Sequence, residues 1–176
     1  MARPNTEQSQ ALERLREEVL GQMEAMDFID QKMVNQLRQQ ALGVLRKSAT
    51  QRHGVTRWNR LPDGQLMVHS VELHPVLLQP LWWEYAAFVL YHEFLHALGW
   101  RAHDPAFRAL EACWPHAEAA AMGPSFTHAM RSSRASWMWR CPQCEQEFPR
   151  QRKAAGRYLC RTCRCVLEDI AVKDAQ

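Results

Sequence analysis

The chain has 176 residues, 47% of them hydrophobic, which is enough for one medium-sized domain and a small appendage. No apolar run is long enough to span a bilayer and the polar N-terminus carries no secretory signal, so we expect an intracellular protein of the cytoplasm, nucleoid or nucleus, neither secreted nor in a membrane. The net charge of +3 is uneven: residues 131–165 carry +7 and the remainder −4, so a polyanion should meet the C-terminal part first.

The N-terminal part is expected to be a scaffold of two helices and a hairpin. Residues 7–26 place apolar side chains three and four positions apart, which predicts an amphipathic helix. Asp30 can cap a second helix, whose buried stripe we expect to reach Leu45. The pattern then alternates over residues 55–60 and 65–73, on either side of a Leu-Pro-Asp-Gly turn, and predicts two paired strands.

A third, strongly apolar helix is expected after Pro80, and it carries the sequence His-Glu-Phe-Leu-His at residues 92–96. Histidines four positions apart lie on one helical face, so His92 and His96 can bind a single ion. Glu93 lies about 100° around the helix, where it can take a proton from metal-bound water without being a ligand. The pattern is typical of the catalytic zinc site of a hydrolase.

A catalytic zinc usually has three protein ligands, so the sequence must supply one more. The preferred candidate is His103, which is reached after the helix ends at Gly99. Glu111, on a helix expected over residues 105–114, is the alternative third ligand. Asp104 can either cap that helix or hydrogen-bond a ligand imidazole.

The C-terminal part contains two Cys-x-x-Cys pairs separated by fifteen residues. Four thiolates at this spacing predict a tetrahedral structural zinc in a zinc ribbon, because about thirty residues cannot be stabilised by core burial alone. The predicted ligands are Cys141, Cys144, Cys160 and Cys163. Cys165 is expected to be a free thiol, although it could compete as a ligand.

Aromatic and basic side chains alternate around these cysteines, a pattern that favours nucleic-acid binding through base stacking and phosphate contacts. The candidate residues are Trp137, Trp139, Arg140, Arg150, Arg152, Lys153, Arg157 and Tyr158. The structural alternative is that a small ribbon needs aromatic side chains to cover its hydrophobic face.

In combination these motifs resemble the SprT-like (Spartan-type) zinc metalloprotease family over about residues 30–168. The matching segments are Trp58-Asn59, residues 92–96, 103–107, 139–144 and 160–167. The resemblance implies a zinc-dependent endopeptidase with one catalytic and one structural zinc, in which Glu93 is the general base and acid. It also implies DNA as a partner, DNA-bound or DNA-crosslinked proteins as substrates, and activity gated by nucleic acid.

The expected fold is α+β: a mostly helical, zincin-like domain with a small β-sheet, followed by the ribbon. The expected parts are an N-terminal helix (1–28), the catalytic domain (29–125), a linker (126–136) entered from a weak helix, the zinc ribbon (137–168) and a tail (169–176). The sequence gives no indication of the oligomeric state.

Two other functions stay open at this point. A YbeY-like zinc endoribonuclease has a similar histidine pattern, but its third histidine would fall at Ala102 and its counterpart of Glu93 is typically glycine. A non-catalytic zinc-ribbon adaptor would bind nucleic acid and keep the histidines as a vestige. Retention of Glu93 favours the protease, because a purely structural metal site needs no neighbouring base.

Overall fold

The computed structural model describes residues 2–172 and is an α+β protein of two compact units, divided after Gly123. The coarse fold class predicted from the sequence is therefore confirmed. The first unit contains α1 (Thr6–Met23), α2 (Gln31–Arg38), β1 (Leu42–Val44), β2 (Gly54–Arg60), β3 (Leu66–Leu73), the 3-10 turns η1 (Pro75–Leu78) and η2 (Pro80–Trp82), α3 (Trp83–Ala97), α4 (Pro105–Glu111) and α5 (Ala117–Ala121). Among the described residues, no helix is both long and apolar enough to cross a bilayer.

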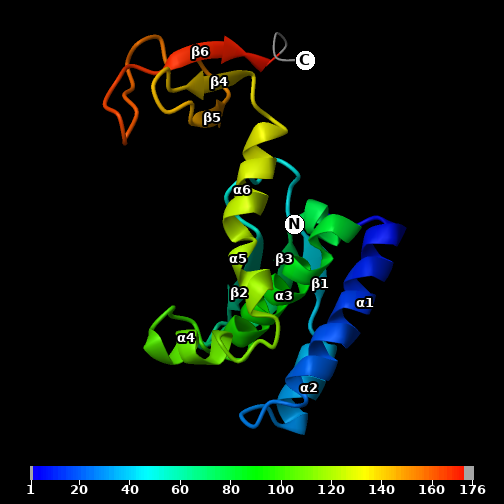
Figure 1. Ribbon diagram of the computed structural model, residues 1–176. Helices are drawn as coiled ribbons and strands as arrows, with labels where there is room; N and C mark the ends of the chain where they lie inside the picture. Colours follow the sequence, from blue (N-terminus) through cyan, green and yellow to red (C-terminus); the bar gives the residue numbers. More distant parts are fainter. Residues whose placement is uncertain (1, 173–176) are drawn as a thin grey trace. The chain divides into compact units, whose positions relative to one another are not determined.

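Helix α3 is the centre of the first unit, with α1 alongside it and the sheet packed against it (Figure 1). The helix is apolar almost all round, and Tyr91 and Phe94 on it are fully buried. Pro80 starts the 3-10 turn that leads into it, as a fixed φ favours a helical start. A helix held on several sides can position its polar side chains rigidly.

The three strands of this unit lie in the order β1-β3-β2. β2 and β3 pair antiparallel, as predicted, with a register shift between Arg57 and Trp58. β2 is an edge strand, and no strand within residues 2–172 pairs with its outer side. Its outer backbone groups therefore make no strand pairing within the described residues.

The predicted extension of the second helix to Leu45 is wrong. α2 ends at Arg38, and residues 42–44 instead form β1, which runs parallel to β3. In this position Val44 and Leu45 are buried, and Leu45 N–H donates to the carbonyl of Leu73 at 2.8 Å. Apolar periodicity over so few residues does not separate the end of a helix from a short strand.

The second unit contains most of α6 (Gly123–Ser132) and a three-stranded antiparallel sheet of β4 (Trp137–Arg140), β5 (Glu147–Arg150) and β6 (Glu168–Ala171), in the order β5-β4-β6. The predicted boundaries differ here. α6 occupies much of the predicted linker, residues 126–136. Residues 169–171, predicted as the start of the tail, belong to β6 and pair with β4. A four-residue strand at a chain end has too few residues to show a period.

Candidate metal sites

The side chains of His92, His96 and His103 converge on one point. Their Nε2 atoms lie 3.0 to 3.2 Å from one another, and the three residues form a group that could hold a metal ion. Two nitrogen ligands of tetrahedral zinc, each about 2.0–2.1 Å from the ion, are separated by roughly 3.3 Å. The three histidines therefore fit a zinc ion, with a fourth position left open.

The opposite ring nitrogens of two of these histidines are held by acceptors. His92 Nδ1 lies 2.6 Å from Glu111 Oε1, and His96 Nδ1 lies 2.6 Å from the Trp100 carbonyl oxygen. Each contact fixes the Nδ1–H tautomer and leaves Nε2 free to bind a metal. Arg108 in turn donates to Glu111 Oε2 at 2.5 Å. Glu111, the alternative third ligand in the sequence, is thus placed behind His92 and not in the ligand group.

The segment after α3 brings the third histidine back to the first two. The helix ends at Ala97, and Gly99 adopts a φ of +113°, which favours glycine and reverses the chain. Asp104 caps α4 by accepting from Phe107 N–H at 2.8 Å, so capping is the role it takes. The Phe107 ring is fully buried and lies 4.7–5.0 Å from all three imidazoles. It forms an apolar floor under the site.

Burial lowers the pKa of His92 and of His96. Desolvation disfavours the charged imidazolium, and only the neutral ring binds a metal. The environment therefore favours the metal-binding form of both rings.

Glu93 is buried beside the histidines, with 6% of its surface exposed. Thr56 on β2 donates to Glu93 Oε2 at 2.8 Å, and burial raises the pKa of Glu93 to about 7, an effect that the Thr56 hydrogen bonds oppose. Gly54 lies so close that a Cβ there would be 2.8 Å from Glu93 Oε1. Glu93 is predictable from the sequence, whereas Gly54 and Thr56 are not, because nothing local to these two residues indicates a contact with the helix.

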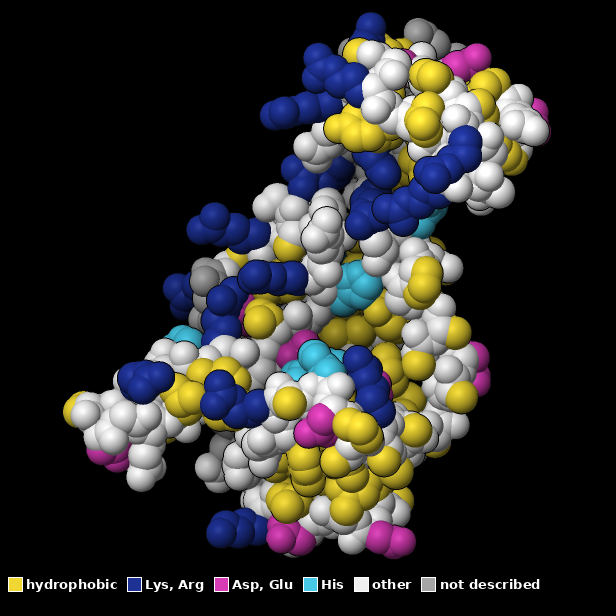
Figure 2. Space-filling model, turned by 90° about the vertical axis from the view of Figure 1, so that its left-hand side faces the viewer, with side chains coloured by type: hydrophobic (Ala, Val, Ile, Leu, Met, Phe, Trp, Pro, Cys, Tyr) yellow, Lys and Arg dark blue, Asp and Glu magenta, His cyan; other side chains and the backbone are white. Residues whose placement is uncertain are grey.

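These groups line one cavity of about 700 Å³ between β2 and α3. His92, Glu93 and His96 contribute from α3, and Thr56 and Trp58 contribute from β2. A cavity of this size accommodates several residues of an extended chain or a small molecule. Cationic side chains lie beside histidines on the face that Figure 2 shows.

Replacing Glu111 by glutamine is expected to weaken metal binding at the histidine site by about 10- to 100-fold, because the carboxylate that orients His92 is lost. The measurement is competition for zinc against a chelator of known affinity. Glu118→Gln, an exposed carboxylate on α5, is the matched control and should leave the affinity unchanged. Equal affinities in both variants would show that Glu111 does not support the ligand.

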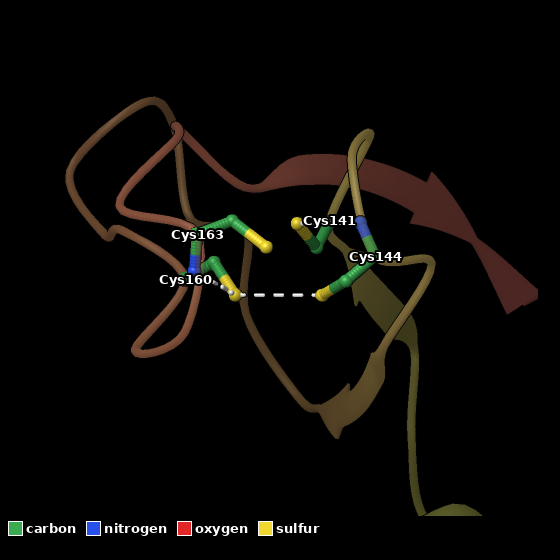
Figure 3. Close-up of side chains that lie close together, drawn as sticks. All are labelled: Cys141, Cys144, Cys160 and Cys163. Atoms are coloured by element: carbon green, nitrogen blue, oxygen red, sulfur yellow. Dashed lines mark hydrogen bonds between the residues drawn. The ribbon is translucent and has the colours of Figure 1, made fainter.

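The four cysteines Cys141, Cys144, Cys160 and Cys163 form the second group that could hold a metal ion. Their sulfurs point toward a common centre from two loops (Figure 3). Cys144 Sγ and Cys160 Sγ lie 3.7 Å apart, close to the roughly 3.8 Å between two sulfurs bound to tetrahedral zinc at about 2.3 Å each. The thiol donor set favours zinc over a harder ion.

The two cysteine loops repeat one local structure. In each, the N–H of the second cysteine points at the sulfur of the first, at 3.4 Å from Cys144 to Cys141 and at 3.5 Å from Cys163 to Cys160. Glu145 and Arg164, the residues that follow the two cysteine pairs, both have a positive φ. Cys165 is placed with its sulfur 3.2 Å from that of Cys141, outside the group of four.

The candidate nucleic-acid-binding residues are placed unequally. Trp139 is only 8% exposed, and its ring contacts the stacked ring of Tyr158, 4.5 Å away, and the guanidinium of Arg150, 4.9 Å away. Trp139 therefore belongs to the small hydrophobic cluster of the second unit, whereas Tyr158 is 50% exposed. Arg140 pairs with Glu145 at 2.9 Å, so part of its charge is already neutralised.

The other four candidates are distributed as follows. The ammonium of Lys153 lies 4.4 Å from the centre of the partly buried Trp137 ring. Arg152 and Arg157 are exposed, and within residues 2–172 neither forms an ion pair with a carboxylate. These two arginines and Tyr158 are the candidates most open to a nucleic acid.

The chain matches no protein-family model, no curated protein and no solved structure. Its function is therefore inferred from its own residues.

Proposed function

We propose that the protein is a zinc-dependent endopeptidase of the SprT-like type, with His92, His96 and His103 as zinc ligands and Glu93 as general base and acid. The single observation that supports this most strongly is the convergence of three Nε2 atoms beside a buried carboxylate in one cavity. A purely structural metal site does not need a general base beside its ligands. In this proposal the first unit is the zincin-like catalytic domain and the second unit carries a zinc ribbon.

A zinc ion held by three histidines would lower the pKa of a water at its open position toward about 7 and polarise a substrate carbonyl. Glu93 accepts the proton of the attacking water and delivers it to the leaving amine. Thr56 holds the carboxylate on the cavity side through its hydroxyl. Phe107 excludes water from beneath the imidazoles, which strengthens electrostatic interactions in the site.

The edge strand β2 is a suitable place for the substrate. An extended peptide can pair with the free edge of a sheet, so that backbone hydrogen bonds provide affinity without a sequence requirement. β2 has such an edge and also lines the cavity of Glu93. DNA-bound or DNA-crosslinked proteins are the proposed substrates, because the +7 charge of residues 131–165 favours a polyanion near the enzyme.

The test is cleavage of a DNA-binding protein, and of the chain itself, by the wild type and by Glu93→Gln, each with and without DNA. Cleavage that requires both Glu93 and DNA supports a DNA-gated peptidase. Cleavage of RNA in place of protein would assign the YbeY-like ribonuclease. Binding of DNA without any cleavage by the wild type would assign the adaptor.

Replacing Gly54 by alanine is expected to reduce peptidase activity by about 10²-fold. The new Cβ would lie 2.8 Å from Glu93 Cγ and from Val89 Cγ1, so the carboxylate must shift, and misplacement by about 1 Å has effects of this size. Steady-state hydrolysis is the measurement. Gly21→Ala on α1, where a Cβ has no neighbour within 4 Å, is the matched control. Equal activities would show that the Gly54 contact does not position Glu93.

A further inference from the structure

The first unit has its own concentration of positive charge, in addition to that of residues 131–165. Residues 46–60 contain five Lys and Arg and no acidic residue, whereas residues 1–123 as a whole have 12 basic and 14 acidic residues. We call these cations, with Arg101, the basic strip: Arg46, Lys47, Arg52, Arg57, Arg60 and Arg101. A net negative unit that segregates its cations in this way has a surface suited to an anion.

A second cavity lies along the strip. Its volume is about 450 Å³, and its lining includes Arg46, Arg52, Arg57 and Glu72. The carboxylate of Glu72 is buried and held by Arg57 through two hydrogen bonds of 2.5 and 3.0 Å. The acid therefore serves to orient Arg57, and the cavity presents the remaining guanidinium groups to a ligand.

The two cavities lie on either side of β2 and share one cation. Thr56 lines the first cavity and contacts α3, whereas Arg57, the next residue, points to the opposite face and lines the second. Arg52 lines both. Arg52 precedes Gly54, the first residue of β2, so a ligand that follows the strip from one cavity to the other passes around the start of the strand.

Most of the strip is available for binding. Arg46, Arg52, Arg60 and Arg101 are exposed, and within residues 2–172 none of them pairs with a carboxylate. The guanidinium of Arg101 instead lies over the Trp58 ring, 5.2 Å from its centre, and both residues line the first cavity. Arginine beside an aromatic ring favours contacts with phosphate and base together.

We propose that the basic strip is a binding site for single-stranded nucleic acid on the first unit, distinct from the ribbon. A double helix is too stiff to follow cations around the start of β2, since its persistence length is about 150 base pairs, whereas a single strand can bend there. An acidic peptide matches less well, because an extended peptide is accommodated by the free backbone edge of β2 and does not need the second cavity. The site places a nucleic acid beside the cavity of Glu93, and it stands whether or not the protein hydrolyses peptides.

The test is the affinity of the full-length, zinc-loaded protein for a fluorescent single-stranded DNA, measured over a range of salt concentrations. Arg46→Gln with Arg52→Gln should weaken binding and reduce the slope of log affinity against log salt by about 1.4, since each phosphate contact of a single strand contributes about 0.7. Arg14→Gln with Lys32→Gln removes the same charge from exposed positions of α1 and α2 and should leave the slope unchanged. A slope that is equal in the two variants would overturn the proposal.

Two further arms separate this site from its neighbours. In the first, a poly-glutamate peptide replaces the DNA. If the Arg46→Gln, Arg52→Gln variant binds the peptide more weakly than the wild type does but binds DNA equally well, the strip is a site for acidic peptides and the proposal is overturned.

In the second, the strip substitutions are repeated in a protein that also carries Arg152→Gln and Arg157→Gln in the ribbon. The two sets of changes should add if the sites are independent. Loss of the strip effect in that background would show a single site and overturn the assignment to the first unit. Thermal unfolding of each variant checks that it is folded. Arg60→Gln is an independent strip substitution that should also weaken DNA binding.

Discussion

Replacing Glu93 by glutamine is expected to reduce peptide hydrolysis by about 10² to 10⁴-fold, the usual contribution of a positioned general base and acid. Glutamine has nearly the same shape, so it can still accept the hydrogen bond from Thr56, but it cannot take a proton from water. The three imidazoles are untouched, so zinc binding should be preserved. The measurement is turnover of a protein substrate by enzyme whose zinc content has been determined.

The matched control is Glu84→Gln, an exposed carboxylate in the first turn of the same helix. It removes the same charge from α3 and should leave turnover unchanged. Full activity in the Glu93 variant would rule out this residue as the base. Loss of zinc together with activity would indicate that Glu93 supports the metal site and would leave its catalytic role without support.

Replacing Cys160 and Cys165 together by serine is expected to unfold the ribbon and leave the first unit folded. The ribbon core is small, and two of its five buried residues are the cysteines Cys141 and Cys160. Structural zinc contributes an apparent free energy of about 10–16 kcal/mol in comparable small domains, far more than such a core supplies. Both thiols are removed because the sulfur of Cys165, 3.2 Å from that of Cys141, could replace a missing ligand.

Nuclear magnetic resonance of the indole N–H groups measures this result. The Trp139 Nε1–H donates to the Arg152 carbonyl at 2.8 Å, so its signal should move to the unfolded position, while that of the buried Trp114 in the first unit should remain. Cys113→Ser removes an exposed thiol outside the cluster and should change neither signal. A native Trp139 signal in the double variant would contradict the idea that the ribbon depends on its metal.

The sequence predicted those parts of the sites that depend on local spacing. His92 and His96 follow from the helical period, and the cysteine pairs follow from the geometry of a four-residue loop, so both groups are found where they were expected. His103 is preferred over Glu111 by its spacing and its ligand type, and the positive φ of Gly99 then reverses the chain toward the other two histidines. The zincin-like and zinc-ribbon assignments, by contrast, stay proposals.

The parts that the sequence did not predict depend on contacts between distant segments. Thr56 and Gly54 touch Glu93 across 37 and 39 positions of the chain, and no periodicity encodes such a pair. The role of Glu111 was open because a carboxylate can be either a ligand or a partner of a ligand, and only the position of its oxygen relative to His92 distinguishes the two. Trp139 was a candidate for base stacking, and its burial depends on how the ribbon closes.

The central claim is that the three histidines hold a zinc ion separate from that of the ribbon, and metal content tests it most directly. The purified wild type should contain two zinc ions per chain, matching the two ligand groups. His96→Ala should lose one of them, and the Cys160→Ser, Cys165→Ser variant should lose the other. A wild type with a single zinc ion that His96→Ala retains would contradict the account, because the histidine cluster would then hold no zinc.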